Sequence, residues 1–321
     1  MNILIVGAGA VGLVYGQYFA RAGHRVTFFI KEKHRAALED GVVLVEKRRW
    51  RADRVSHVED FSLLYEWDEV ASQTWDQVVL AISSDALRAL PFDTVRPVTG
   101  DATVVMLQPS DADYALLSEY WPAGHIVKGM INLISYYHPL PGEAPLDDPA
   151  AIKIAYFMPP TAMPLSGYSG RVMQTLALFR DSGIGCKVVD DAVSASRLPN
   201  AVLMTFLCAL EACDWQFARL RSDRVLLSEL VCAQKDLLKA LAHDEGPAQR
   251  RAMKLTGGML CKTLYRMVLR VAPLALPFSL QAYLHEHFMK VRMQTDLYMR
   301  DYRGLCDSEA LAALHERVFH T

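Results

Sequence analysis

Apolar and polar positions in the first 30 residues follow the order of a strand, a glycine turn, a helix and a second strand. An apolar run covers Asn2–Val6, and the largely apolar stretch Leu13–Ala22 contains no proline. Gly23 and His24 end that stretch, and Arg25–Ile30 is a second apolar run. This order predicts a βαβ unit, in which a helix connects two parallel strands.

Further apolar runs indicate that the pattern of strands and helices continues. We expect strands at Val42–Val45, Gln77–Ile82, Thr103–Leu107 and Ile126–Leu133, with helical or loop stretches between most of them. Residues Arg48–Val58 are charged with weak alternation, which is compatible with one arm of a hairpin. The alternation of strands and helices predicts a mostly parallel, doubly wound sheet of the Rossmann type.

The chain changes character near residue 190. Residues Cys186–Val189 have the pattern of a last strand, and helical periodicity dominates beyond them. We expect helices at Ala201–Ala212, Asp223–Ala242 and Ser279–Tyr302. The sequence therefore predicts an α/β fold, in which an N-terminal Rossmann-type domain, residues 1–190, is followed by an all-helical C-terminal domain, residues 191–321.

Composition and charge narrow the class of protein. The 321 residues are 52% hydrophobic and 22% charged, with a net charge of −2, which gives no support for a nucleic-acid or membrane-surface binder. Six cysteines without a C-x-x-C pair favour free thiols in a reduced compartment over disulfides or a metal site. No charged region precedes the first strand, as a signal peptide would require. We expect a cytoplasmic protein with no nucleic-acid or membrane partner, either a monomer or a homodimer.

A glycine-rich motif lies between the first predicted strand and the first predicted helix. Gly7, Gly9 and Gly12, with Ala10 and Val11 between the last two, form a G-x-G-x-x-G sequence in the strand–turn–helix context that dinucleotide binding requires. The first glycine permits a tight turn, the second lets the pyrophosphate approach the backbone, and the third allows close helix–strand packing. The helix N-terminus offers unpaired N–H groups to the phosphates. The alternative is a tight turn that binds no ligand.

The residues after the second strand bear on which dinucleotide binds. An acidic residue there accepts hydrogen bonds from the ribose of NAD, whereas a cation accommodates the 2′-phosphate of NADP. Lys31 is the first residue past the strand, with Lys33 and Arg35 close behind and Glu32 as the one acid among them. The sequence therefore predicts NADP as the cofactor, while a solvated charged loop remains the alternative.

With these features, Met1–Ile30 resembles the start of the ketopantoate reductase (2-dehydropantoate 2-reductase) family. Lys31 stands where that family usually has an arginine for the 2′-phosphate. The resemblance implies an NADPH-dependent reduction of a 2-keto acid. It also implies that a helix lysine protonates the forming alkoxide while asparagine, serine and glutamate residues hold the substrate.

The chain departs from that family at most of the positions that carry the chemistry. Ser83 follows the strand where the family commonly has a lysine, and Pro109 follows Gln108 where it commonly has an asparagine. In the best register of the family's Lys-x₃-Asn-x₃-Asn helix, Asn200 alone fits, and Ser196 takes the place of the lysine. The serine and Thr-Glu expected near the C-terminus resemble Ser279 and Thr295-Asp296, at a stretched spacing.

Other side chains could replace the missing acid. Arg197 could polarise a carbonyl and clamp a carboxylate, although an arginine is a poor proton donor. In a helix over Ser279–Tyr302, His287, Lys290 and Gln294 would share one partly apolar face. A partly desolvated Lys290 would have a lowered pKa, so Lys290 or His287 could serve as the acid. The alternatives are a surface arginine and side chains at a domain edge.

Residues Gly246–His285 contain no acid and six basic side chains. Lys262, Arg266 and Arg270 recur every four residues, so they share one helical face. This face would suit an anionic substrate, an acidic partner or solvent. His285-Glu286-His287 does not have metal-ligand spacing, and we expect no metal.

Taken together, the residues predict an NADP-dependent oxidoreductase. Its first domain would bind NADP, and its second would help to hold a small anionic substrate, a 2-keto acid or related carbonyl, in the interdomain cleft. We expect Lys290, Asn200, Arg197, His287 and Asp296 at the substrate, and Ser83 and Gln108 beside the cofactor. The alternative is a non-catalytic NADP(H)-binding sensor or regulatory module, and reduction of ketopantoate itself is the least favoured reading.

Overall fold

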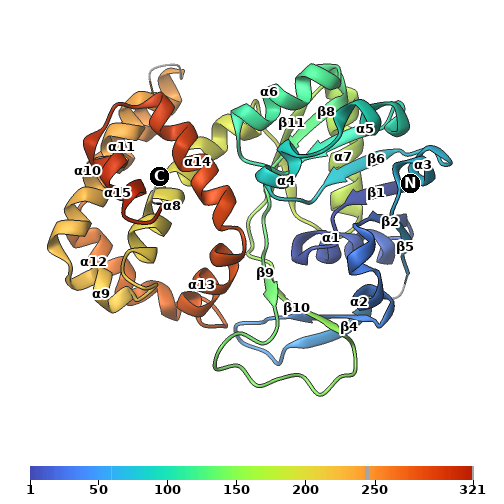
Figure 1. Ribbon diagram of the computed structural model, residues 1–321, viewed down its shortest axis with the longest axis horizontal. Coiled ribbons are helices and arrows are strands. Elements are labelled where there is room, and N and C mark those ends of the chain that lie inside the picture. Colours follow the sequence, from blue (N-terminus) through green and yellow to red (C-terminus); the bar gives the residue numbers. More distant parts are fainter. Residues whose placement is uncertain (59, 243–245, 320–321) are drawn as a thin grey trace. The chain divides into compact units, whose positions relative to one another are not determined.

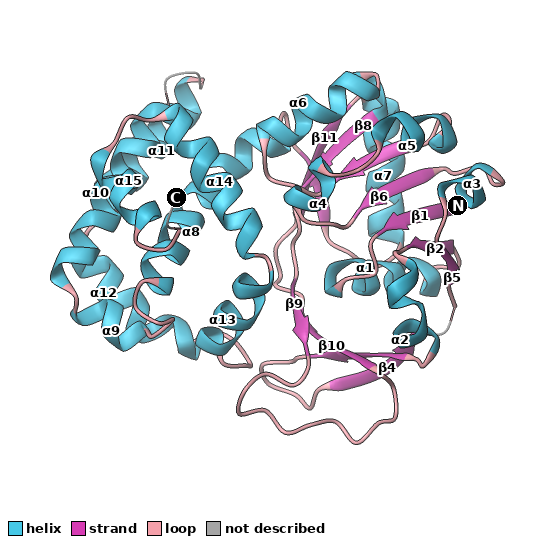
Figure 2. Ribbon diagram, in the orientation of Figure 1, coloured by secondary structure: helices cyan, strands magenta, loops and turns pink. Residues whose placement is uncertain are grey.

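The structure is a computed structural model that describes residues 1–58, 60–242 and 246–319 (Figure 1). It divides into two compact units, Met1–Ala195 and Ser196–Thr321. In the described residues, strands occur in the first unit alone, and the second unit is built from helices (Figure 2). This arrangement confirms the predicted α/β fold class, with a Rossmann-type sheet followed by a helical C-terminal region.

The main sheet of the first unit has β1 (Asn2–Val6) near its centre. Among the described residues it contains eight strands in the order β12-β11-β8-β7-β6-β1-β2-β5. β1 pairs in parallel with β2 and with β6, and only β11 runs antiparallel to a neighbour, β8. The remaining bounds are β2 Arg25–Phe29, β5 Ser62–Leu64, β6 Gln77–Leu80, β7 Thr103–Met106, β8 Ile126–Gly129, β11 Met163–Gly167 and β12 Cys186–Val188.

Helices cover both faces of this sheet, because alternate strand residues point to opposite sides. Ile3 and Ile5 belong to one apolar cluster, together with Phe19 and Phe179, whose rings meet edge to face at 5.1 Å. Leu4 and Val6 belong to a second apolar cluster on the other side of the sheet. The helices are α1 Ala10–Arg21, α2 Arg35–Glu39, α3 Trp67–Ala71, α4 Ser84–Arg88, α5 Phe92–Thr99, α6 Asp111–Tyr120 and α7 Ser169–Asp181.

A smaller sheet in the described residues has the strand order β4-β3-β10-β9. β3 (Val42–Glu46) and β4 (Arg54–Val58) pair antiparallel, which confirms the hairpin that the charged stretch suggested. β9 (Ile134–Tyr137) and β10 (Ile152–Phe157) complete the sheet. The expected strand Ile126–Leu133 is shorter than predicted, because the main-sheet strand ends at Gly129 before the chain enters β9.

The second unit packs its helices around one apolar cluster. Leu207, Leu230 and Leu314 are fully buried or nearly so in this cluster. α8 (Ala192–Glu211) begins in the first unit, and it is long and apolar enough to pass as a membrane span. However, 56% of the apolar window is buried and Leu207 lies in the core, as in the central helix of a bundle. The other helices are α9 Phe217–Ser222, α10 Arg224–Leu241, α11 Pro247–Met259, α12 Lys262–Val271, α13 Leu280–Lys290, α14 Arg292–Leu305 and α15 Glu309–Glu316.

The predicted continuous helix over Ser279–Tyr302 is wrong. The chain forms α13 and α14 instead, separated by Val291 with φ −107° and ψ +27°. The Val291 carbonyl accepts hydrogen bonds from the backbone N–H groups of Gln294 and Thr295, so a new helix starts from that residue. His287 and Lys290 therefore lie on α13 and Gln294 on α14, and no single helical stripe carries all three.

Candidate functional site

The turn between β1 and α1 depends on Gly7. Its φ of +101° lies in the region that side-chain-bearing residues rarely adopt. A Cβ atom there would also lie 2.9 Å from the Ala81 carbonyl oxygen and 2.7 Å from Cγ2 of Ile82. The Gly7 N–H donates to the Phe29 carbonyl at 3.0 Å, which holds the turn at the carboxyl end of the sheet.

Gly9 and Gly12 have different surroundings. A Cβ atom at Gly12 would overlap the Gly7 carbonyl oxygen and lie 3.3 Å from Cβ of Ala81, so the helix approaches the ends of β1 and β6 closely at Gly12, as the motif predicted. The helix is also tightly packed one turn later, at Gly16, where a Cβ atom would lie 2.5 Å from Cζ of Phe28. A Cβ atom at Gly9 would meet no atom within 4 Å. The packing of the fold therefore does not require a glycine at position 9, and the open side of the turn can admit a ligand.

The N-terminus of α1 faces this open side with donors. Gly9 is the N-cap and has no side chain to accept a hydrogen bond. The Leu13 N–H donates to the Gly9 carbonyl at 2.9 Å and is the first to be paired in the helix. The N–H groups of Ala10, Val11 and Gly12 precede it, and the first turn has no acidic residue. Donors at the positive end of a helix suit a phosphate group.

The charged side chains that follow β2 include both ion pairs and lysines without an ion pair among the described residues. Glu32 lies 3.5 Å from Arg35, and Arg35 also pairs with Glu39 at 2.8 Å. The one acid that argued against NADP is thus held by a cation on its own segment. Lys31 and Lys33 are exposed and make no ion pair within the described part of the chain. This segment can therefore offer two ammonium groups to an anion.

Gln108, predicted beside the cofactor, is nearly fully buried. Its amide nitrogen donates to the carbonyls of Leu80 at 3.1 Å and Ile82 at 2.6 Å, and its oxygen accepts from the Leu107 N–H at 3.1 Å. The side chain thus joins the carboxyl ends of β6 and β7. Ser83 follows β6 as the N-cap of α4 and is half-buried. Gln108 therefore shapes the sheet edge at which Ser83 lies.

Two of the residues predicted at the substrate are engaged inside the helical unit. Nδ2 of Asn200 donates to the Tyr302 hydroxyl at 2.7 Å, and Asn200 is 8% exposed. The Asp296 carboxylate is buried and lies 2.7 Å from Nε2 of His315 and 2.8 Å from the Arg300 guanidinium. The buried Asp296 charge is therefore balanced within its own unit.

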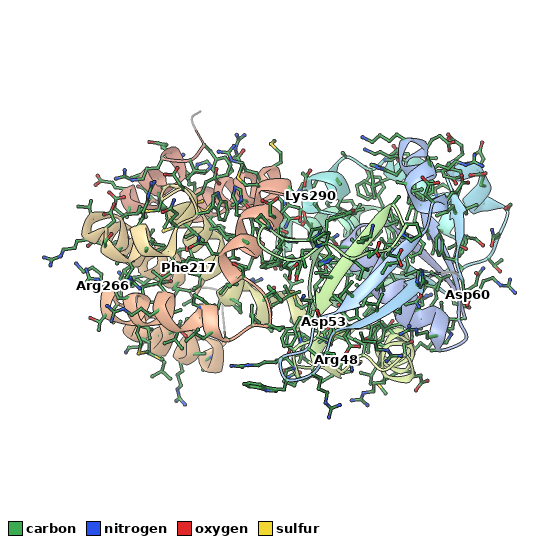
Figure 3. The ribbon with its side chains drawn as sticks, turned by 90° about the horizontal axis from the view of Figure 1, so that it is seen from below. Arg48, Asp53, Asp60, Phe217, Arg266 and Lys290 are labelled. Carbon is green, nitrogen blue, oxygen red and sulfur yellow. The ribbon has the colours of Figure 1, made fainter. Side chains whose placement is uncertain are left out.

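The remaining predicted residues differ in exposure. Burial and the nearby Lys290 ammonium lower the pKa of His287 to about 4, and its ring stacks on Tyr283 at 5.2 Å. His287 is therefore neutral at pH 7. Lys290, labelled in Figure 3, is the last residue of α13. It is exposed, whereas we expected a partly desolvated side chain from the sequence. Arg197, on α8, is half-buried.

The sequence pattern did not indicate a half-buried carboxylate, Glu143, in the loop after β9. Glu143 accepts hydrogen bonds from the Tyr136 hydroxyl at 2.8 Å and the Leu140 N–H at 3.0 Å, and it pairs with Lys47 at 3.2 Å. Burial raises the pKa of Glu143, but these partners outweigh burial and leave the pKa lowered. Lys47 also pairs with Asp53. No motif marks these residues, and we interpret the cluster as an anchor for the loop after β9.

Metal ligands do not gather in the part of the chain that the structure describes. No group of three or more His, Cys, Asp and Glu side chains that could hold a metal ion occurs there.

The sequence and the fold were compared with those of known proteins. Residues 3–159 match the family described as ketopantoate reductase PanE/ApbA. No curated protein matches the chain. The 2-dehydropantoate 2-reductase of Geobacter metallireducens GS-15 has a similar structure, with a TM-score of 0.59, 16% identity, and coverage of 94% of this chain and 100% of that one. The corresponding enzyme of Porphyromonas gingivalis W83 has a TM-score of 0.57, 15% identity, and coverage of 91% and 99%.

A further solved structure that is similar is D-mandelate dehydrogenase with NADH and anilino(oxo)acetate. Its TM-score is 0.67 at 14% identity, and the match covers 99% of this chain and 97% of that one. At such identities these likenesses establish the fold. The match over residues 3–159 shows that the first unit is similar to the ketopantoate reductase PanE/ApbA domain, and the solved structures show the fold at low identity.

Proposed function

We propose that this chain is an NADP(H)-dependent oxidoreductase that reduces a small 2-keto acid or a related carbonyl compound. The observation that carries the proposal is the β1–α1 turn, in which Gly9 is open while Gly7 and Gly12 are tightly enclosed. The amides of Ala10, Val11 and Gly12 would bind the pyrophosphate. Lys31, assisted by Lys33, would bind the 2′-phosphate, because their charges are not neutralised by Glu32.

The substrate class follows from the family and from the residues of α8. Ketopantoate reductases and D-mandelate dehydrogenase are named for 2-keto and 2-hydroxy acids, which interconvert by hydride transfer at the carbon next to a carboxylate. Bound NADPH would supply the hydride. Arg197 would clamp the carboxylate through its planar fork, and Asn200 would orient the carbonyl. We do not propose ketopantoate itself, because Ser196 and Pro109 replace the family's lysine and asparagine.

The proton for the forming alkoxide needs a separate donor. His287 is neutral at pH 7, because its pKa is about 4, and so it lacks the proton that a general acid must give. We therefore assign this role to Lys290, whose position at the end of α13 leaves its ammonium accessible. Asp296 is held by His315 and Arg300, so we propose that it supports α14 rather than taking part in proton transfer.

A survey of cofactor oxidation tests this proposal. The purified chain is mixed with NADPH and a panel of 2-keto acids that differ in side-chain size, and loss of reduced cofactor is followed. We expect at least one keto acid to be reduced, with kcat falling ~10²–10⁴-fold in Lys290→Met. NADPH affinity should be unchanged in that variant, and Lys262→Met, another exposed lysine, serves as the control. No oxidation with any keto acid would contradict the proposal.

A second candidate function is a binding module that holds NADP(H) without turnover. Two observations favour it: the amide of Asn200 is engaged by Tyr302, and Lys290 is exposed. In that case NADPH would bind with the same preference over NADH, but no keto acid would accelerate its oxidation. The survey above separates the two functions.

A further inference from the structure

A pocket in the helical unit shares no residue with the site proposed above. Its lining residues come from α9, α12, the turn after α12 and the start of α13, and its volume is about 530 Å³. Figure 1 labels these three helices in the helical unit. This volume falls within the range of small-molecule sites, roughly 300–1,000 Å³. The lining residues are Phe217, Ala218, Arg221, Leu269, Arg270, Pro273, Ser279, Leu280 and Gln281.

The lining of the pocket combines apolar side chains with two cations. Phe217 and Leu269 are 6% and 3% exposed and belong to the core, whereas Pro273 and Leu280 are half-buried and offer apolar surface to a ligand. Arg221 and Arg270 line the same pocket, no lining residue is acidic, and neither arginine makes an ion pair within the described residues. Two guanidinium groups around one small volume repel each other, and an anion between them would relieve that repulsion.

The acids nearest to these arginines in sequence are already engaged. Asp214 pairs with Arg219, and Asp223 accepts the Leu226 N–H at 2.9 Å as the N-cap of α10. On the α12 side, residues 246–285 contain no acid at all. No acidic side chain is among the described residues that line the pocket, so a ligand there meets the two arginines without a competing carboxylate in the lining.

The walls of the pocket are fixed by hydrogen bonds that leave donors available. Nε of Arg266 donates to the Arg221 carbonyl at 3.3 Å, which ties α12 to the end of α9; Figure 3 labels Arg266 and Phe217 on this unit. Oε1 of Gln281 accepts the Phe217 N–H at 3.0 Å, which ties α13 to α9. The amide nitrogen of Gln281 makes no hydrogen bond within the part of the chain described. A rigid pocket with charged and amide donors is suited to a carboxylate.

We propose that this pocket binds a small organic anion, a carboxylate on an apolar or aromatic body. The guanidinium groups of Arg221 and Arg270 hold the carboxylate, and the apolar body rests on Pro273 and Leu280. An inorganic anion would leave that apolar surface uncovered, which is why we favour an amphipathic ligand. The site is separate from the proposed cofactor and substrate residues, so it does not depend on the proposed function.

Calorimetric titration of the full chain with 3-phenylpropionate, in the absence of NADP(H), tests this proposal. We expect saturable binding that weakens ~10-fold or more in Arg221→Gln and in Arg270→Gln, because each loses a charge-assisted contact. Lys262→Gln removes the same charge from the same helix as Arg270→Gln, but outside the pocket, and should change affinity less than about twofold. Melting curves of the three variants establish that each is folded.

The neutral analogue 3-phenylpropanamide provides a test on the unaltered chain. We expect it to bind ~10-fold or more weakly than the carboxylate, because it cannot pair with two guanidinium groups. Equal affinity for amide and carboxylate, equal effects of Lys262→Gln and Arg270→Gln, or binding of inorganic phosphate alone would each overturn the proposal. NADPH is absent from these titrations, so failure of the proposed function would leave their outcome unchanged.

Discussion

Replacing Gly9 by alanine separates the needs of the fold from those of the cofactor. The added methyl group would meet no protein atom within 4 Å, and φ −76° with ψ −179° suits alanine. Alanine is a poorer N-cap than glycine, but it restricts the unfolded chain, and each effect is worth about 1 kcal/mol or less. We therefore expect the unfolding free energy of Gly9→Ala to lie within ~1 kcal/mol of the wild type.

The same methyl group would stand on the open side of the turn, where the pyrophosphate is proposed to bind. Each hydrogen bond from a backbone amide to a charged phosphate is worth ~1.5–3 kcal/mol. Displacing the phosphate from one such amide should weaken NADPH binding ~10–100-fold. Fluorescence titration with NADPH measures this loss, and urea unfolding measures stability in the same preparation.

Two companion variants show whether the effect belongs to the ligand. Gly170→Ala changes a glycine in the first turn of α7 whose nearest non-neighbouring atom would be 3.9 Å away. It should leave NADPH affinity unchanged and shift the unfolding free energy by no more than ~1 kcal/mol. Gly12→Ala forces a Cβ atom onto the Gly7 carbonyl and should lower both stability and affinity. Unchanged NADPH affinity in Gly9→Ala would refute the assignment of the turn as the pyrophosphate site.

Further predictions concern the cofactor, the substrate and pH. Lys31→Ala should lower the ratio of NADPH affinity to NADH affinity ~10-fold or more in binding titrations. Equal affinities for the two cofactors in the wild type would contradict the NADP assignment. Ketopantoate should be a poor substrate, and kcat/KM above ~10⁴ M⁻¹s⁻¹ in a standard reductase assay would show that the family's chemistry is retained. The pKa of His287, about 4, lies below its unfolded value, so stability should fall as pH drops from ~6.5 toward 4. The urea midpoint of His287→Gln should fall less steeply with decreasing pH than that of the wild type. An identical dependence on pH would exclude His287 as the cause.

The first unit could be predicted because its determinants are local. Gly7, Gly9 and Gly12 lie within six residues of each other, and the alternation of Ile3 with Leu4 indicates a strand that is buried on both faces. These signals need no knowledge of distant residues. The fold class and the resemblance of the first residues to ketopantoate reductases followed from them.

The second unit could not be predicted to the same depth, because its determinants are distant in sequence. Asn200 is engaged by Tyr302, 102 residues away, and no local pattern announces that partner. Val291 has no helix-breaking side chain, yet the helix ends there, so the predicted stripe through Gln294 does not form. The partners of Glu143 come from both arms of the small sheet, which sequence alone did not bring together.

Transfer of deuterium from the cofactor to the substrate would demonstrate catalysis by this chain without ambiguity. NADPH labelled with deuterium at the transferred position of nicotinamide C4 is incubated with the chain and with the keto acid that most accelerates its oxidation. The product is then analysed by mass spectrometry. We expect a 2-hydroxy acid that carries deuterium on the former carbonyl carbon, and its yield should fall in Lys290→Met. Tight NADPH binding without any deuterated product would contradict catalysis and leave the chain as a binding module.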